Sequence, residues 1–203
     1  MQGTFAFYQE PAPQRTPHPE RLFFGLFPDV ATSRRVGRFA ARLVGDRGLA
    51  GTRVKDERLH VSLHHVGDYR RLRSKVIYAA QLAAKAVSAP PFEVTFRFVT
   101  SFRLPPSRDG RPARTALALL GEGDALSELY RTLGAAMEMS GLRPSPRFVP
   151  HMTLLYGPSA VPLQAIDPIQ FVADELVLVH SERGLGRYHA IDRRPLEGLP
   201  PPT

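Results

Sequence analysis

The sequence predicts an α+β protein, in which strands and helices follow one another without a regular repeat. Short apolar or alternating segments typical of strands are interspersed with three longer segments whose apolar residues recur every three to four positions. Prolines, 20 in 203 residues, mostly separate these segments and mark their ends. The chain is long enough to bury a substantial core as one domain.

Three segments have helical spacing. In the first, Val36, Ala40 and Val44 fall on one side and arginines on the other, which predicts a basic amphipathic helix. The expected helices are residues 30–47, 71–88 and 124–140.

Seven segments have the composition or alternation of strands. Residues 92–102 place Phe92, Val94, Phe96 and Phe98 on one face, and the next strand follows after a loop rich in proline and arginine. This pair predicts a hairpin with a basic tip, which is a candidate contact for an RNA backbone. The expected strands are residues 21–27, 59–66, 92–102, 115–120, 149–155, 171–179 and 188–192.

Composition excludes several kinds of protein. The chain has no cysteine, which removes disulfides, thiolate zinc sites and cysteine nucleophiles. No apolar run is long enough to span a bilayer, and the first residues lack the features of a secretory signal, so we expect a cytoplasmic protein. Proline-rich tails are expected at residues 1–19 and 197–203, with a single domain between them at residues 20–196.

The chain is strongly basic, with 27 Lys and Arg against 19 Asp and Glu and a net charge of +8. Such an excess creates a field that attracts polyanions. RNA or nucleotides are therefore the partners that the charge favours, although arginine-rich composition alone does not define a site.

Two segments share a pattern of histidine, apolar residue, hydroxyl residue and leucine. They are residues 60–63, His-Val-Ser-Leu, and residues 151–154, His-Met-Thr-Leu. In a strand, residues two positions apart share a face, so each segment presents an imidazole beside a hydroxyl. An imidazole can give or take a proton near neutral pH, and a hydroxyl can donate a hydrogen bond to a phosphate oxygen. The alternative is a pair of buried histidines that are hydrogen-bonded within a core.

These motifs occur in a longer order of segments: RLFFGLFPD, RLHVSLHHVG, RFVPHMTLLYG and LVLVHSERGLGRYHAI. That order resembles the two-histidine (2H) phosphoesterase superfamily, in its branch of RNA 2',3'-cyclic phosphodiesterases and 2'-5' RNA ligase-like proteins, over residues 20–195. The resemblance implies a two-lobed, pseudo-symmetric fold with antiparallel sheets and flanking helices around a central groove. It also implies that His60 and His151 are catalytic and that Ser62 and Thr153 bind the substrate.

Other positions match or depart from the same branch. Arg147, Phe148, Pro150 and Ser181 match it, and Arg147 is a candidate contact for RNA phosphate. Tyr156 stands where the branch often has arginine, and we expect it to stack on a base, the alternative being that it caps the core. Arg53 stands where a tryptophan is common.

The alternation of side chains along a strand predicts where the two histidines after the first motif point. His64 lies two positions beyond Ser62, so it should line the groove beside His60, with a surface histidine or a ligand of a metal shared with His60 as the alternatives. His65 should face the opposite way.

By resemblance, the chain hydrolyses RNA 2',3'-cyclic phosphate ends to 2'-phosphates without a metal or other cofactor, and the reverse reaction would be 2'-5' ligation. We assign His60 as the acid and His151 as the base, and we expect a monomer. One alternative is a phosphodiesterase for small cyclic nucleotides. Another is a non-catalytic module of the same fold that binds RNA or a nucleotide.

Overall fold

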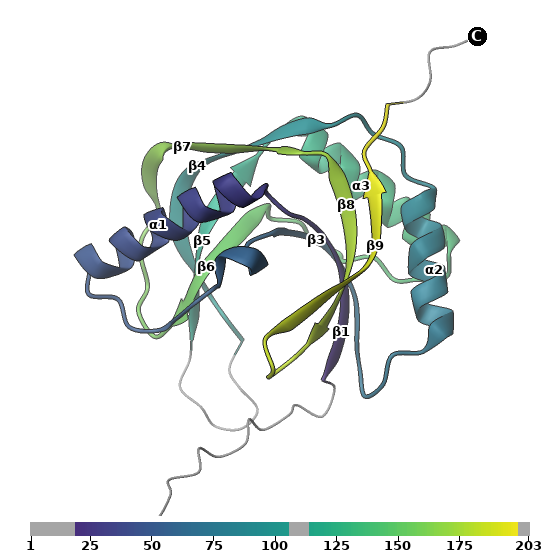
Figure 1. The fold of residues 1–203 in the computed structure, drawn as a ribbon, viewed down its shortest axis with the longest axis horizontal. Helices are drawn as coiled ribbons and strands as arrows, with labels where there is room; N and C mark the ends of the chain where they lie inside the picture. The colour runs from purple at the N-terminus through teal and green to yellow at the C-terminus, as the bar shows by residue number, and fades with distance from the viewer. Residues whose placement is uncertain (1–18, 106–113, 199–203) are drawn as a thin grey trace, which may run out of the picture.

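The protein is described by a computed structural model that covers residues 19–105 and 114–198. Strands and helices alternate irregularly, as the sequence predicts (Figure 1). The strands are β1 (Glu20–Leu26), β2 (Thr52–Arg53), β3 (Val61–Tyr69), β4 (Phe92–Arg103), β5 (Thr115–Glu122), β6 (His151–Gly157), β7 (Gln164–Ala173), β8 (Glu175–Glu182) and β9 (Arg187–Pro195). The helices are α1 (Val30–Asp46), α2 (Ser74–Lys85), α3 (Asp124–Met139) and a short 3-10 helix, η1 (Asp56–Arg58).

The strands form one antiparallel sheet that divides into two halves. The β6 lobe has the order β7-β4-β5-β6 and the β3 lobe has the order β3-β1-β8-β9, with β2 beside β6. The halves join where β3 meets β6, and the register there has a single residue pair, Val61 opposite Met152. The predicted α+β fold of two lobes is thus confirmed.

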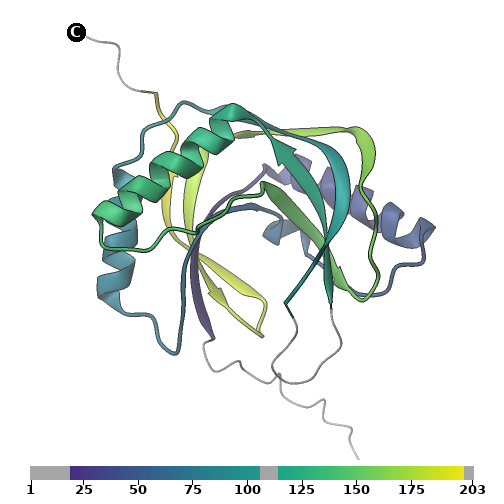
Figure 2. The same cartoon turned by 180° about the vertical axis from the view of Figure 1, so that it is seen from behind.

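The three helices cover the sheet from different sides. Helix α1 lies against β6 and β7 in the β6 lobe (Figure 1), whereas α2 and α3 pack against each other beside β8 and β3 (Figure 2). Helix α1 begins after Asp29, whose carboxylate accepts a hydrogen bond from the backbone N–H of Thr32 at 2.9 Å. Its buried face includes Val36 and Ala40, and its arginines are exposed, which confirms a basic amphipathic helix.

The segment predicted as one strand at residues 171–179 is instead the junction of two strands. Strand β7 ends at Ala173 and β8 begins at Glu175, with Asp174 between them. Strand β7 pairs only with β4 and lies at an edge of the sheet, and Pro168 is tolerated because it falls in the irregular stretch between the paired residues Ala165 and Ile169. Its polar residues and proline concealed it in the sequence.

Strands β3 and β6 each carry an irregularity just beyond the histidine motif. On β3, Gly25 of β1 lies opposite Ser62 and Phe23 lies opposite His65, so β3 has one extra residue between them; a second follows between His65 and Gly67, which lies opposite Leu22. On β6, Leu117 of β5 lies opposite Leu155 and Ala118 lies opposite Thr153, which again leaves one extra residue on the motif strand. Such a bulge reverses the face to which the following side chains point.

Both predicted tails lie outside the described residues except for Pro19, Glu197 and Gly198. Arg108 and Arg111 of the expected hairpin tip also lie outside them. Among the described helices, none combines the length and apolar character needed to cross a membrane.

Candidate active site

The two histidine motifs meet at the junction of the lobes. Val61 and Met152 are the middle residues of the motifs, they pair across β3 and β6, and both are fully buried. Because side chains alternate along a strand, the residues that flank this pair share the opposite face. His60, Ser62, His151 and Thr153 therefore gather on one side of the sheet.

These four side chains line a cavity of about 210 Å³, here called the motif cavity. The other residues that line it are Arg21, Phe23, His65, Tyr156 and Tyr188. A larger hollow of about 700 Å³ lies beside the start of α1, but no residue of either motif lines it. The smaller cavity, which the motif residues line, is therefore the candidate active site.

Both motif histidines are held by the same backbone contact. Nδ1 of His60 lies 2.7 Å from the carbonyl oxygen of Arg58, and Nδ1 of His151 lies 2.7 Å from that of Val149. A carbonyl oxygen can only accept, so each Nδ1 carries the hydrogen. In the neutral rings Nε2 is then the basic nitrogen, and in His60 it accepts a hydrogen bond from the Ser62 hydroxyl at 2.9 Å.

His60 is enclosed by aromatic rings. Phe27 stacks on it at 5.3 Å between ring centroids, and Phe23 and Tyr188 lie at 5.0 and 5.6 Å. Burial lowers the pKa of His60 to about 4, against the raising effect of the Arg58 carbonyl; the positive charges of His151 and Arg58 lower it further. His60 is therefore neutral at pH 7 in the free site.

Arg58 takes part in the enclosure of His60. Its guanidinium lies over the ring of Tyr188, 4.4 Å from the centroid, and its Nε is buried without a hydrogen-bond partner. The cation is thus held by the π face of Tyr188. Gly25, opposite Ser62, completes the packing: an added Cβ would lie 3.2 Å from the Val61 carbonyl oxygen and 3.4 Å from Cδ2 of His60.

The prediction that His64 faces the groove is wrong. The bulge on β3 turns His64 into the core, where it is 1% exposed and stacks on Tyr130 with centroids 4.0 Å apart. Its Nε2 donates to the Tyr130 carbonyl oxygen at 2.8 Å, and its Nδ1 accepts from the backbone N–H of Ser145 at 3.0 Å. His65, expected to face away, lines the motif cavity instead.

Tyr156 and His65 occupy equivalent places in the two lobes. Each lies five residues after its motif histidine, beyond two consecutive buried residues that include the bulge. Tyr156 lines the motif cavity, as expected for a residue that could contact substrate, and the Arg114 guanidinium lies 5.7 Å from its ring centroid. The pseudo-symmetry of the lobes therefore extends from the motifs to these two side chains.

Arg147 is not brought to the motif cavity. It is exposed, and it is not among the residues that line the cavity. Its neighbour Phe148 stacks on Tyr130 at 4.3 Å and anchors this segment to α3. The buried Ser181 lies on β8 opposite Arg21, and Arg53 donates to the Gly37 carbonyl oxygen at 3.1 Å.

Four residues of the cavity were not predicted as parts of the site: Arg21, Phe23, His65 and Tyr188. Arg21 and Phe23 alternate on β1, so they share the cavity face while Leu22 and Phe24 enter the core. The segment RLFFGLF contains that alternation, but its composition predicts only a buried strand.

Within residues 19–105 and 114–198, no three histidine or carboxylate side chains are grouped so as to hold a metal ion.

Solved structures with the same fold include bacterial proteins. The chain is similar to Escherichia coli LigT complexed with ATP, with 23% identity, a TM-score of 0.66, and coverage of 88% of this chain and 99% of that one. It is similar to TT0787 of Thermus thermophilus, with 20% identity, a TM-score of 0.66, and coverage of 88% and 98%. At these identities the likeness establishes the fold.

The sequence itself matches a family model. No curated protein is similar enough in sequence to count as a match. Residues 28–185, however, match the model of the 2'-5' RNA ligase superfamily, and this span contains both histidine motifs. Because the match covers well over half of the chain, the protein belongs to the 2'-5' RNA ligase superfamily of two-histidine phosphoesterases.

Proposed function

We propose that this protein hydrolyses the 2',3'-cyclic phosphate at the end of an RNA to a 2'-phosphate, with His60 and His151 as an acid–base pair and without a metal. The observation that carries the proposal is the motif cavity, around which two imidazoles with fixed tautomers and two hydroxyls converge. Such a set supplies an acid, a base and hydrogen-bond donors for phosphoryl oxygens.

The reaction balances with these groups alone. One neutral Nε2 takes a proton from water as the water oxygen attacks phosphorus. The bond from phosphorus to the 3' oxygen breaks, and the protonated Nε2 of the other histidine gives its proton to that oxygen. Ser62 leaves its hydrogen bond with His60 to donate to a non-bridging oxygen, and Thr153 does the same from the other lobe.

Either histidine can take either role, because both have the same Nδ1 contact, which leaves Nε2 as the nitrogen that exchanges the proton. The neutral state of His60 in the free site favours it as the base, which is the reverse of the assignment made from sequence. A substrate with sulfur in place of the 3' oxygen separates the two orders. A thiolate leaves without protonation, so this substrate should restore turnover only to the alanine variant of the acid.

RNA is favoured over a free nucleotide by the charge of +8 and by the exposed arginines of α1. Tyr156 lines the cavity and is 36% exposed, which supports its proposed role as a ring on which a base stacks. Escherichia coli LigT has been crystallised with 3'-AMP and with phosphate, ligands that carry the group proposed to bind here.

The test is a panel of substrates in the presence of EDTA: a short RNA with a 2',3'-cyclic phosphate end, the same RNA with a 3'-phosphate, and small cyclic nucleotides. We expect the cyclic RNA end to give a 2'-phosphate, identified by phosphorus NMR. Alanine at Ser62 or Thr153 should slow turnover, whereas His189→Ala, an exposed histidine outside the cavity, should not.

Three outcomes would contradict this function. Turnover confined to small cyclic nucleotides would identify a nucleotide phosphodiesterase. Binding of the cyclic end without turnover would identify a non-catalytic module, and loss of activity in EDTA that is restored by a divalent metal would overturn the metal-independent mechanism.

A further inference from the structure

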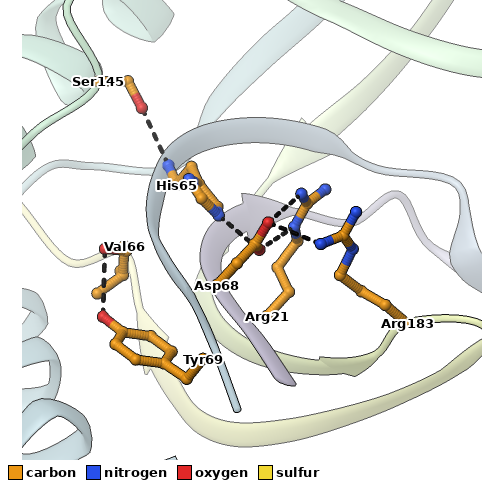
Figure 3. Close-up of polar contacts among 7 residues, drawn as sticks. All are labelled: Arg21, His65, Val66, Asp68, Tyr69, Ser145 and Arg183. Atoms are coloured by element: carbon orange, nitrogen blue, oxygen red, sulfur yellow. Dashed lines mark hydrogen bonds and ion pairs between the residues drawn. The ribbon is translucent and has the colours of Figure 1, made fainter. Parts of the chain in front are cut away.

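A cluster of charged side chains lies at one end of the motif cavity. Asp68 accepts hydrogen bonds from Arg21 through Nε at 2.7 Å and Nη2 at 2.8 Å, from Arg183 at 2.9 Å and from the His65 imidazole at 2.9 Å (Figure 3). Burial opposes the ionised carboxylate, but the hydrogen bonds from Arg21 and His65 outweigh it and hold the pKa of Asp68 far below its ordinary value. Asp68 is therefore a carboxylate throughout the physiological range.

The cluster is in register with the motif. Along β1, Gly25 lies opposite Ser62, Phe23 opposite His65 and Arg21 opposite Asp68. Each such step is two residues along β1, or about 7 Å of strand, and three residues along the bulged β3. The row thus runs from the first motif through His65 to Asp68, and Arg21 and His65 line the same cavity as His60.

The cluster has more positive than negative charge. Two guanidiniums and one imidazole surround a single carboxylate, so the cations that contact Asp68 outnumber it. Arg21 uses two of its five N–H groups on Asp68, and its side chain is 39% exposed. Nothing else in the described part of the chain bonds to this guanidinium, so its remaining donors face the cavity and solvent.

We propose that Arg21 and His65, oriented by Asp68 and supported by Arg183, form a second phosphate subsite that binds the phosphate on the 5' side of the terminal nucleotide. This inference rests on the proposed function and names the substrate feature that the site recognises beyond the reacting phosphate. A planar guanidinium fixed along one edge presents its free edge to a phosphate in a defined direction. Asp68 acts here as a positioning residue, because it holds Arg21 without touching the substrate.

The subsite also explains why an acidic residue stands at a site for anions. An arginine that is held on two atoms loses less side-chain freedom when it binds than a free one. Asp68 offsets the charge of one arginine, and the second arginine restores a positive charge that attracts phosphate, while His65 offers a further hydrogen-bonding group.

The experiment compares kcat/KM for four substrates: a cyclic mononucleotide, the same nucleotide with a 5'-phosphate, a dinucleotide with a cyclic end, and that dinucleotide with a neutral methylphosphonate linkage. We expect the natural protein to prefer the dinucleotide over the cyclic mononucleotide by about tenfold. The methylphosphonate should lose this preference. In Arg21→Gln the preference, taken as the ratio of kcat/KM for the dinucleotide to that for the mononucleotide, should fall close to one.

The matched control is Arg97→Gln, which removes another arginine paired to a carboxylate, 2.6 Å from Glu122 on the β6 lobe. It should leave the preference unchanged. Asp68→Asn should weaken the preference as well, and Arg21→Lys should restore it only in part because lysine lacks the fork. If the 5'-phosphorylated mononucleotide has the same kcat/KM as the dinucleotide, a terminal 5'-phosphate is sufficient for the subsite. If only the dinucleotide is preferred, the phosphate that the subsite binds is the linkage of an RNA chain.

The subsite is overturned if the methylphosphonate dinucleotide is hydrolysed as well as the natural one, or if Arg21→Gln keeps the full preference. The substrate comparison uses the natural protein and so does not depend on the stability of a variant. Failure of the proposed function looks different: the cyclic mononucleotide and RNA ends are both left intact, or their turnover survives in His60→Ala.

Discussion

The enclosure of His60 predicts that acid weakens the fold through this one side chain. The folded protein binds a proton at His60 only near pH 4, whereas the unfolded chain binds it at about pH 6.5. Between these values the unfolded state holds more protons, so the free energy of unfolding decreases as the pH falls through this window. At 1.36 kcal/mol per pH unit the full effect is about 3 kcal/mol, and we expect about 2 kcal/mol because the ring edge is open to the cavity.

The measurement is the free energy of unfolding in guanidinium chloride at pH 7 and pH 4.5, for the natural protein and His60→Asn. Asparagine keeps a donor for the Arg58 carbonyl but does not titrate, and the contribution of the buried His64 is common to both proteins. The natural protein should lose about 2 kcal/mol more than the variant between the two pH values. Equal losses, or a His60 NMR titration midpoint near 6.5, would refute the argument.

Three further predictions follow from contacts around the site. Asp68→Asn should lower the free energy of unfolding by about 2 kcal/mol, because two arginines lose their carboxylate; a change below about 0.5 kcal/mol would contradict this. His64→Ala should cost about 3 kcal/mol through two buried hydrogen bonds and a cavity, measured by chemical unfolding, and an unchanged midpoint would exclude a structural role. Gly25→Ala should slow turnover while it lowers the melting temperature only slightly, because the added methyl group contacts the Val61 carbonyl oxygen and the His60 ring. Normal turnover would show that the strand moves to accommodate the methyl group.

Both histidine motifs could be predicted from the sequence because alternation along a strand acts over two residues. His60 and Ser62, and His151 and Thr153, needed only that local rule to be placed on a common face. That the two motifs face one cavity is a property of the pairing of Val61 with Met152, which lie 91 positions apart in the chain. Only the resemblance to a family anticipated it.

The same local rule failed at the next residues of the strand, just beyond Ser62. It placed His64 in the groove and His65 outside, because nothing in single-residue propensities announces a bulge. The repeated spacing of the two motifs contained a signal, since the residue five positions after each histidine lines the cavity in both lobes. Arg21 and Tyr188 were beyond reach, because their place in the site depends on the order β3-β1-β8-β9.

The most direct test of the account is the rate at which a short RNA with a 2',3'-cyclic phosphate end is hydrolysed by the natural protein, His60→Ala, His151→Ala and the double variant, all in EDTA. If the two histidines act on one phosphate as a unit, each single variant loses nearly all activity and the double variant is no slower than the worse single one. Activity that survives in either single variant, or losses that multiply in the double variant, would contradict the central claim.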